Sequence, residues 1–444
     1  MLAAAAAATL FLLLAWFRVG SEPHLEAVPH LTGIGPLTKI DLRAAADGRG
    51  LVDLKSELVQ GDTVWPLFDK TYDHRPFWAF WGPAVAEEST TVEVGKSIQR
   101  ELMPGEATLR LTSSRAATPL RHPASTVLET TLPVRLRPPE LSLVSGPTQV
   151  RQGGSAAVVY RVGAGAVRHG LILGERQIET RGESGDLHGL LFGAPFDLQD
   201  GSEAIRLFAE DELGNRGELR FVTNYVSRTL KTDNIGLSDG FFDKVVPEIL
   251  AQTPEIVEQG SRLESYLQIN RDLRRRNAQE LVDLSAGSSD GFLWQGRFEQ
   301  LPSSRVMAGF AERRTYLYDG KNVDEQVHLG FDLASRQQAP VPAANRGKVL
   351  LARYFGIYGK TVVVDHGRGL MSLYSHLSDI AVQVGDSVEA GDILGRTGAT
   401  GLAGGDHLHY SMLIHGVQVD PLEWWDGRWI QSHITSVIDE AGAP

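Results

Sequence analysis

The amino-acid sequence predicts a mainly β chain with two Ig-like β-sandwich modules, a helical connector and a C-terminal antiparallel β domain. Short runs in which apolar and polar residues alternate, separated by glycine and proline, predict half-buried strands over most of the chain. The alternation gives way to a helical period between residues 238 and 284, and strand-like runs return after residue 296. The length of 444 residues suits about three domains, each able to bury its own core.

The first segment, residues 1–20, is dominated by an apolar run. No charged residue occurs from Leu2 to Phe17, and Arg18 is the first charged side chain. As a helix this run would be about 24 Å long, shorter than the hydrocarbon core of a bilayer, about 30 Å. Both a signal peptide and a short, mismatched membrane anchor fit this length, and the bulky residues before a possible cut after Ser21 favour the anchor. We therefore expect an exported protein.

Residues 31–137 are predicted to form the first β-sandwich module. Apolar and polar side chains alternate in several short runs, as expected of antiparallel strands with one buried face. Three tryptophans of this module are expected in its core or at a domain interface, because large aromatic side chains are mostly buried, and a ligand platform is the less favoured alternative: Trp65, Trp78 and Trp81.

Residues 139–228 are predicted to form a second module of the same kind. Pro138 and Pro139 separate it from the first, since neither residue can donate a hydrogen bond to a strand ladder. The polar segment 211–215 predicts a hairpin turn before the last strand. The simplest interpretation is two small β-sandwiches in series.

Residues 238–285 are predicted to be a helical connector. Two apolar stripes at helical spacing are separated by Pro254 and Gly260, which predicts two successive helices. The second stretch carries four arginines on its polar face, and a solvated helix face is the expected explanation for them: Arg271, Arg274, Arg275 and Arg276.

The composition excludes several classes of protein. The absence of cysteine excludes disulfide scaffolds, thiolate zinc sites, iron–sulfur clusters and a cysteine nucleophile, so any metal site must use nitrogen and oxygen ligands. A net charge of −12 without a long basic run argues against a nucleic-acid partner, which would need a basic surface.

The candidate chemistry lies in residues 296–425, which are rich in histidine and glycine. His328 and Asp332 flank Gly330, which we expect to let the backbone bend so that both side chains converge. His407 and His409 are two residues apart, so on a strand both point to one face. Two imidazoles and one carboxylate, with a fourth position left to water, form a recognised catalytic zinc set.

Several motifs of this stretch, in order and spacing, together resemble the lysostaphin-type (LytM-like) zinc peptidases, which cut the peptide part of bacterial peptidoglycan. These motifs are Ser-Arg-Val-Met-Ala-Gly-Phe, His-Leu-Gly-Phe-Asp-Leu-Ala, Leu-Tyr-Ser-His-Leu-Ser, a glycine-rich run after Val384, His-Leu-His-Tyr and Val-Asp-Pro. The resemblance implies a LytM-like antiparallel β catalytic domain. It also implies that Zn²⁺ is ligated by His328, Asp332 and His409, and that His376 and His407 line the catalytic face.

Two positions depart from the family pattern. Asp406 stands where the family usually has proline before His-Leu-His, and Ser411 stands where glutamate is common. Neither departure removes an implied ligand, but Asp406 leaves the shape of the local loop and the substrate preference open.

The residue types also constrain the mechanism. The chain contains no His-Glu-x-x-His motif, so a helix-borne glutamate base is not available and a histidine must accept the proton of the attacking water. We assign His407 as the base and His376 as the residue that orients water or stabilises the oxyanion, with an exchange of the two roles left open.

We therefore predict a zinc-dependent endopeptidase that hydrolyses peptide cross-links of peptidoglycan. Its expected place is the periplasmic side of the cell envelope, anchored in the inner membrane by the N-terminal segment, or secreted if that segment is cleaved. Peptidoglycan peptide stems are the expected substrate, and envelope proteins could bind the β-sandwich modules. Residues 426–444 are expected to form a helical tail that closes the domain or docks on a neighbour.

Two alternatives remain. A non-catalytic relative would bind peptidoglycan or activate an amidase, but such relatives typically lose metal ligands, whereas all three implied ligands are present here. A third possibility is a scaffold whose modules dock envelope partners while upstream segments hold the peptidase latent.

Overall fold

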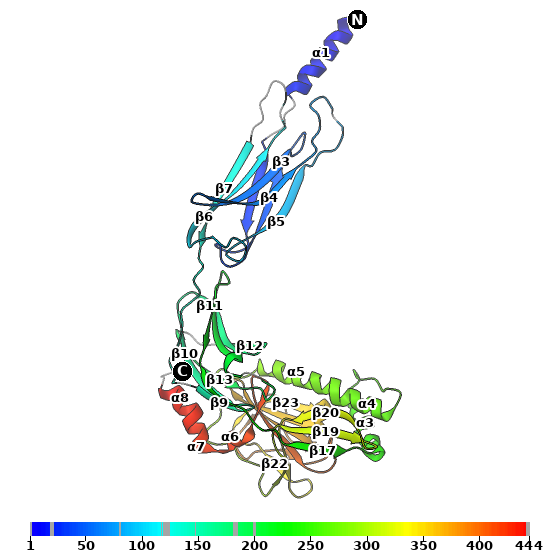
Figure 1. Cartoon of the computed structure of the whole chain (residues 1–444). Helices are drawn as coiled ribbons and strands as arrows, with labels where there is room; N and C mark the ends of the chain where they lie inside the picture. Colours follow the sequence, from blue (N-terminus) through cyan, green and yellow to red (C-terminus); the bar gives the residue numbers. More distant parts are fainter. Residues whose placement is uncertain are drawn as a thin grey trace. The chain divides into compact units, whose positions relative to one another are not determined.

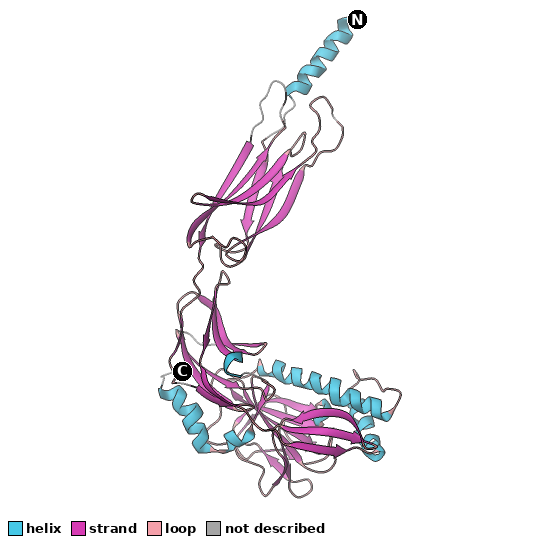
Figure 2. Cartoon of the chain, in the orientation of Figure 1, coloured by secondary structure: helices cyan, strands magenta, loops and turns pink. Residues whose placement is uncertain are grey.

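A computed structural model of the chain describes residues 2–17, 22–79, 81–116, 118, 125–146, 148–180, 185–198 and 201–440. Strands predominate among them (Figure 2), which confirms the predicted mainly β class. The chain packs as two compact units, of which the first comprises Met1–Pro139, Ala164–Val167 and Ala209–Gly217, and the second the remainder. The predicted module boundaries are finer than this division and stay predictions.

The first element is the helix α1 (Leu2–Phe17), which has 16 residues. Among the described residues, no helix combines the length and the apolar character needed to cross a membrane. Arg18 and Ser21, on which the cleavage question depends, lie outside the described residues.

Two antiparallel sheets enclose the core of the first unit. One has the order β1–β2–β5 and the other β4–β3–β6–β7. Alternate residues of the strands point inward, as in β2, where every second side chain is buried. The strands are β1 (His24–Pro29), β2 (Thr38–Ala45), β3 (Asp53–Gln60), β4 (Thr63–Thr71), β5 (Glu87–Val94), β6 (Gly105–Ser114) and β7 (Ser125–Val134).

The expected burial of the tryptophans is wrong for two of the three. Trp65 packs partly buried against the core of the first unit. Trp78 and Trp81 lie between β4 and β5, where their rings contact each other edge to face, and are 51% and 67% exposed.

The second series of strands forms three small sheets, with the orders β13–β10–β8, β12–β11–β14–β15 and β16–β9. The predicted turn at 211–215 lies between β14 and β15, which pair in one sheet. The elements are β8 (Leu141–Leu143), β9 (Thr148–Arg151), β10 (Ser155–Val162), β11 (Ala166–Leu173), β12 (Arg176–Glu179), β13 (Leu187–Gly193), α2 (Gly201–Ala204), β14 (Ile205–Asp211), β15 (Arg216–Arg220) and β16 (Val222–Val226).

The predicted helical stretch is confirmed. It contains α3 (Asp239–Gln252), which Ser238 caps through its side chain, and a longer helix of three parts. These parts are α4 (Arg262–Gln268), a π-helical turn η1 (Ile269–Leu273) and α5 (Arg274–Ser285).

A solvated helix face is the wrong explanation for Arg274 and only part of the explanation for Arg271, whose side chain is 49% exposed. Arg271 pairs with the buried Asp324, its Nε lying 2.9 Å from Oδ1. Arg274 is only partly exposed and lines a cavity described below. Arg271 lies within the π-helical turn η1, and Arg274 follows it directly.

An eight-stranded sheet is the framework of the C-terminal part of the chain, with the order β18–β21–β29–β25–β24–β23–β27 and β30 paired to β29. Two smaller sheets, β17–β19–β20 and β22–β28–β26, accompany it. The first members are β17 (Thr232–Gly236), β18 (Arg305–Ala308), β19 (Glu312–Tyr318), β20 (Lys321–His328), β21 (Phe331–Ala334), β22 (Pro340–Pro342) and β23 (Gly347–Tyr354). The others are η2 (Gly356–Tyr358), β24 (Lys360–Gly367), β25 (Leu370–Leu377), β26 (Asp379–Ile380), β27 (Ser387–Val388), β28 (Ile393–Arg396), β29 (Leu408–Ile414) and β30 (Val417–Val419).

The two faces of this sheet pack against different partners. Leu373 and Leu413 belong to a buried cluster with α3, η1 and α5, whose helices run beside the strands in Figure 1. Tyr374 and Met412 belong to a second cluster with the C-terminal helices. Because side chains alternate along β29, His409 shares the face of Leu413 and points to the helical side.

The C-terminal tail of the structure, residues 421–440, begins before the predicted tail at 426–444 and packs against the rest of the chain. It contains α6 (Pro421–Trp425), α7 (Gly427–Ile430), η3 (Gln431–Thr435) and α8 (Ser436–Glu440). Ile430, Ile434 and Ile438 are buried in the same cluster as Ala157 of β10 and Leu191 of β13. The tail therefore joins the C-terminal sheet to strands of the second series.

Candidate metal centre

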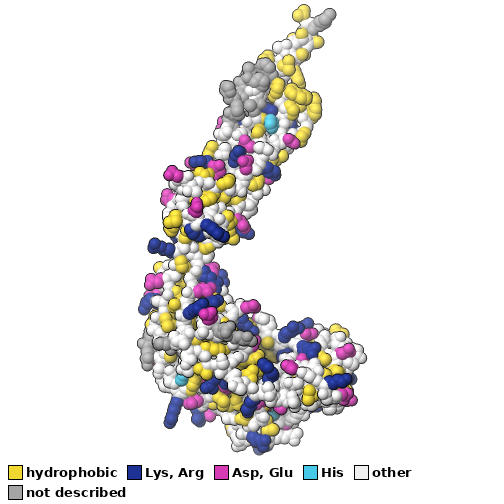
Figure 3. All heavy atoms as spheres, in the orientation of Figure 1, with side chains coloured by type: hydrophobic (Ala, Val, Ile, Leu, Met, Phe, Trp, Pro, Cys, Tyr) yellow, Lys and Arg dark blue, Asp and Glu magenta, His cyan; other side chains and the backbone are white. Residues whose placement is uncertain are grey.

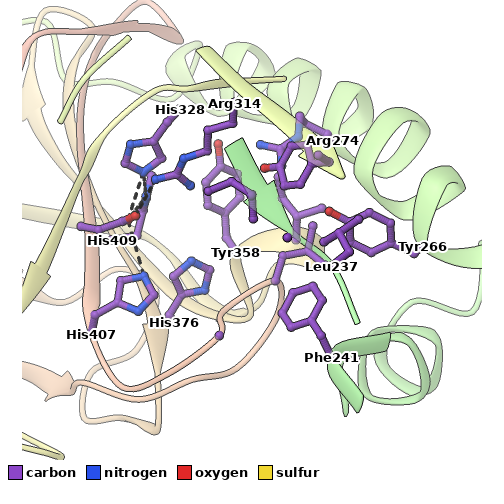
Figure 4. A pocket seen from close by; sticks show the side chains of 17 residues that line it. Leu237, Phe241, Tyr266, Arg274, Arg314, His328, Tyr358, His376, His407 and His409 are labelled. Carbon is purple, nitrogen blue, oxygen red and sulfur yellow. Dashed lines mark hydrogen bonds and ion pairs between the residues drawn. The ribbon is translucent and has the colours of Figure 1, made fainter. Parts of the chain in front are cut away.

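Three strands of two sheets bring together the three implied metal ligands. His328 is the last residue of β20, Asp332 lies in β21, and His409 lies directly opposite Asp332 in the antiparallel β21–β29 pair. His328 Nε2 is 3.0 Å from Asp332 Oδ1 and 2.9 Å from His409 Nδ1, which is itself 3.0 Å from Asp332 Oδ1. Figure 4 shows the rings of His328 and His409 close together at one side of the cavity.

The hydrogen bonds on the outer side of this group fit a metal ion. His328 Nδ1 donates to the carbonyl of Gly309 over 2.9 Å, which leaves its Nε2 lone pair directed inward. His409 Nε2 is 3.1 Å from Ser411 Oγ, and Ser411 donates its own proton to the carbonyl of Leu329 over 2.8 Å. His409 therefore donates through Nε2 and directs its Nδ1 lone pair inward. The inner atoms then present only lone pairs to one another, which a cation between them would satisfy.

Gly330 is needed beside the metal group for a different reason from the one predicted. Its backbone is not in the left-handed region, so no special bend depends on it. A Cβ atom at this position would lie 2.6 Å from His409 Nε2 and 2.7 Å from Ser411 Oγ. Glycine is needed here because the His409 ring and its hydrogen-bond partner occupy the space of a side chain.

His376 lies beside this group in a strained backbone conformation. Its φ of +61° is in the left-handed region, which costs a non-glycine residue about 1–3 kcal/mol. Its Nδ1 donates to the carbonyl of Thr400 over 2.8 Å, so the unprotonated Nε2 is free to accept a proton or a hydrogen bond. Burial holds the pKa of His376 well below its usual range.

His407 completes the cluster and is its more accessible histidine, with 17% of its side chain exposed. Its ring centroid is 4.9 Å from that of His376, and its Nε2 is 3.5 Å from Asp332 Oδ1. Its Nδ1 donates to the carbonyl of Gly405 over 2.8 Å, so Nε2 carries no proton in the neutral ring and faces Asp332 when the ring is protonated. Burial lowers the pKa of His407, but the hydrogen bond and charge of Asp332 outweigh it and the net shift is upward.

Asp406, one of the two departures from the family pattern, holds the loop before His407. One carboxylate oxygen accepts a hydrogen bond from Thr397 Oγ over 2.6 Å, and the other accepts one from the backbone of Gln338 over 3.1 Å. The carboxylate thus ties two loops together where proline would supply backbone rigidity.

Arg314 is a site residue that the sequence reasoning missed. Its guanidinium lies 2.9 Å from Asp332 Oδ2, on the side of the carboxylate away from the histidines. In the metal-free chain, burial raises the pKa of Asp332, but the charge of His328 and hydrogen bonds from the histidines outweigh it and hold that pKa well below its usual range. The sequence contained a sign of this position. Arg314 lies two residues before the buried Tyr316 in β19, so both side chains point to the same, inward face of the strand.

A cavity of about 280 Å³ opens beside the metal group. The four histidines and Asp332 form one end of it, and residues of β17, α3, α4 and α5 form the other. Tyr358 and Arg274, neither of which was predicted, also line it. In Figure 4 Arg274 lies on the side of Arg314 away from His328.

Known proteins resemble the part of the chain that contains this site. The model of peptidase family M23 matches residues 326–421. The DD-carboxypeptidase/endopeptidase Mpg of Neisseria meningitidis is 37% identical over 97 residues, which are 22% of this chain and 22% of that protein. The peptidoglycan DD-endopeptidase ShyA of Vibrio cholerae is 29% identical over 177 residues, 39% of this chain and 37% of that protein. The chain therefore spans about one to two fifths of the length of these relatives.

Two solved structures of peptidases also resemble parts of this chain. A putative peptidase M23 from Pseudomonas aeruginosa has 24% identity and a TM-score of 0.40, covering 64% of this chain and 96% of that chain. The catalytic domain of lysostaphin from Staphylococcus simulans has 25% identity and a TM-score of 0.26, covering 30% of this chain and 98% of that chain. The family match to residues 326–421 confirms the resemblance carried by the motifs, and the chain has a peptidase family M23 (LytM-type) domain in its C-terminal part.

Proposed function

We propose that this chain is a zinc-dependent endopeptidase that hydrolyses peptide cross-links of bacterial peptidoglycan. The observation that carries the proposal is the convergence of His328, Asp332 and His409 within hydrogen-bonding distance of one another, with two further histidines in the same cavity. The family match and the peptidoglycan DD-endopeptidase name of the relative ShyA support the substrate class.

We assign the metal to the three inner donor atoms, His328 Nε2, Asp332 Oδ1 and His409 Nδ1. Two imidazoles and one carboxylate leave a zinc ion an open position, and zinc without thiolate ligands suits a catalytic rather than a closed structural site. When bound, zinc would supply a Lewis acid and lower the pKa of a coordinated water to about 7. Gly309 and Ser411 fix the orientation of the two imidazoles from outside.

We assign the proton transfer to His407 and the orientation of the reacting groups to His376. In each ring Nδ1 donates to a backbone carbonyl, that of Thr400 for His376 and that of Gly405 for His407. In the neutral ring the other nitrogen, Nε2, is therefore unprotonated and can accept a proton or a hydrogen bond. His407 is the more accessible of the two and can exchange its proton with solvent, whereas His376 is buried and fixed by strain and by Thr400. Proton acceptance at His407 Nε2 and hydrogen bonding at His376 Nε2 are the roles that this arrangement supports.

The cell envelope is the proposed place of action, because the substrate class lies there. We further propose that the apolar N-terminal segment directs export, as an anchor or as a cleaved signal. Envelope proteins that bind the β-sandwich modules are a further part of the proposal.

The test is hydrolysis of purified cross-linked sacculi by the full chain with zinc, followed by mass spectrometry of the released products. His409→Ala should abolish release and zinc binding together, and His407→Ala should lower the rate about 10²- to 10⁴-fold while zinc stays bound. His433→Ala, an exposed histidine of the tail, is the matched control and should change neither. Wild-type chain that binds sacculi and zinc but releases nothing would support the non-catalytic alternative.

A further inference from the structure

The cavity beside the metal group has an excess of positive charge. Two guanidinium groups line it, those of Arg274 and Arg314, and Asp332 is the single carboxylate among the described lining residues. Asp332 is already paired with Arg314. The other end of the cavity is largely apolar and aromatic, where charge interactions are stronger than in water.

Arg274 is held in place by its neighbours without losing its charge. Its Nε donates to the carbonyl of Asn270 over 3.1 Å, and one terminal nitrogen donates to Asn270 Oδ1 over 2.6 Å. Asn270 is buried and is fixed in turn by Asp324, whose carboxylate accepts from Asn270 Nδ2 over 2.8 Å. Within the described part of the chain, Arg274 forms no ion pair with a carboxylate of its own.

The hydrogen bonds of Arg274 leave most of its donors available. A guanidinium carries five N–H groups, and the two bonds to Asn270 use two of them. The adjacent Asp324 is already paired with Arg271. Arg274 therefore has both the charge and the free donors to bind a planar anion.

Arg274 and Arg314 line the same cavity as the metal group. Arg274 follows the π-helical turn η1, a distortion that is often found at functional sites. Both guanidinium groups line the same cavity as the aromatic ring of Tyr266. Arg314 Nε is itself buried and has no hydrogen-bond partner among the described residues.

We propose that Arg274, assisted by Arg314, forms a subsite for a free carboxylate of the peptide substrate. The inference rests on the proposed function for the nature of the peptide, and it assigns Arg274 a role in specificity rather than in the chemical step. The carboxylate can come from the C-terminus of a peptide strand or from a side chain, and the experiment distinguishes these sources. Residue 274 lies outside the part that matches the M23 family, so a preference made by Arg274 would be a property of the helical segment of this chain.

The test measures binding of soluble cross-linked muropeptides to the full chain by calorimetry after the metal has been removed. Without metal no turnover occurs, and the metal cannot itself bind the carboxylate. Three ligands are compared: the peptide with free carboxylates, the peptide amidated at its C-terminus, and the peptide amidated at its side-chain carboxylates. Amidation at the recognised position should weaken binding to the wild-type chain about 10- to 100-fold, and this comparison requires no variant.

Variants then assign the effect to Arg274. Arg274→Gln should weaken binding of the free peptide to the level of the amidated one and should leave the amidated peptide unaffected. Arg274→Lys, which keeps the charge but loses the planar donors, should give an intermediate affinity. Arg276→Gln, an exposed arginine of the same helix, is the matched control and should bind like wild type.

The outcomes separate this inference from the proposed function. Equal binding of free and amidated peptides to the wild-type chain, or an equal loss of both in Arg274→Gln, would overturn the carboxylate subsite. Hydrolysis by the zinc-loaded chain in that case would leave the proposed function intact. Arg274-dependent discrimination by a zinc-loaded chain that cleaves nothing would retain the subsite and refute the endopeptidase. Absence of both binding and cleavage would refute both.

Discussion

Replacement of Ser411 by alanine should weaken zinc binding without touching a metal ligand. Ser411 is fully buried in β29, and its hydroxyl accepts the Nε2 proton of His409 while donating to the carbonyl of Leu329. In the metal-bound state His409 must keep its proton on Nε2, because Nδ1 is the inner donor atom. Ser411→Ala therefore leaves that proton without an acceptor in the state that binds metal.

The magnitude follows from the cost of a buried donor that has lost its partner, about 1–3 kcal/mol. In the metal-free chain the ring can move its proton to Nδ1 and donate to Asp332 instead, so most of the penalty falls on the metal-bound state. Since about 1.4 kcal/mol corresponds to a factor of ten, zinc affinity should fall about 10- to 100-fold.

Competition with a chromophoric chelator at fixed pH measures this loss. Ser372→Ala is the matched control, because Ser372 is equally buried in the neighbouring strand β25 and contacts another histidine, His366, over 2.7 Å, away from the metal group. It should lower thermal stability but leave zinc affinity unchanged. Unchanged zinc affinity in Ser411→Ala, or an equal loss in both variants, would refute the role assigned to the hydroxyl.

Two further predictions concern metal binding and pH. Gly330→Ala should reduce zinc affinity at least as much as Ser411→Ala, since its Cβ would lie 2.6 Å from the His409 ring, and wild-type affinity by chelator competition would show that the ring can move aside at no cost. Burial raises the pKa of Glu423 from 4.5 to about 7, so the folded chain binds the proton more tightly than the unfolded chain. The free energy of unfolding should therefore fall by up to about 3 kcal/mol as pH rises from about 4.5 to about 7 and then level off. Denaturant titrations at several pH values should show a smaller fall in Glu423→Gln, and identical pH profiles for both proteins would contradict the assignment.

The features that depend on residues close together in the sequence could be predicted. Alternation along the chain identified the strands, and the change to a helical period identified α3 and the helix that follows it. The short motifs named His328, Asp332 and His409 as one site, and the structure shows that Asp332 and His409 face each other across the paired strands β21 and β29. Their roles as zinc ligands stay a prediction until metal binding is measured.

The roles of residues that depend on contacts far away in the sequence could not be predicted in the same way. Arg314 and Arg274 lie outside the matched motifs, and an arginine on a strand or helix is most often solvated. Only the packing of α4, η1 and α5 against β19 and its neighbours turns Arg274 toward the cavity. Gly330 was singled out correctly but for the wrong reason, because the space it vacates is filled by a side chain far away in sequence.

The docking of the C-terminal tail determines which fragments of this protein can be expected to fold. The carboxylate of Glu423 accepts a hydrogen bond from the backbone of Ser155, and the indole of Trp424 donates one to the side chain of the same residue. A fragment that starts at residue 296 would remove these acceptors and donors together with the apolar side chains of β10 and β13. Residues 326–421 are thus a unit of family resemblance rather than of folding, and a smaller catalytic protein should retain the strands that begin near residue 140.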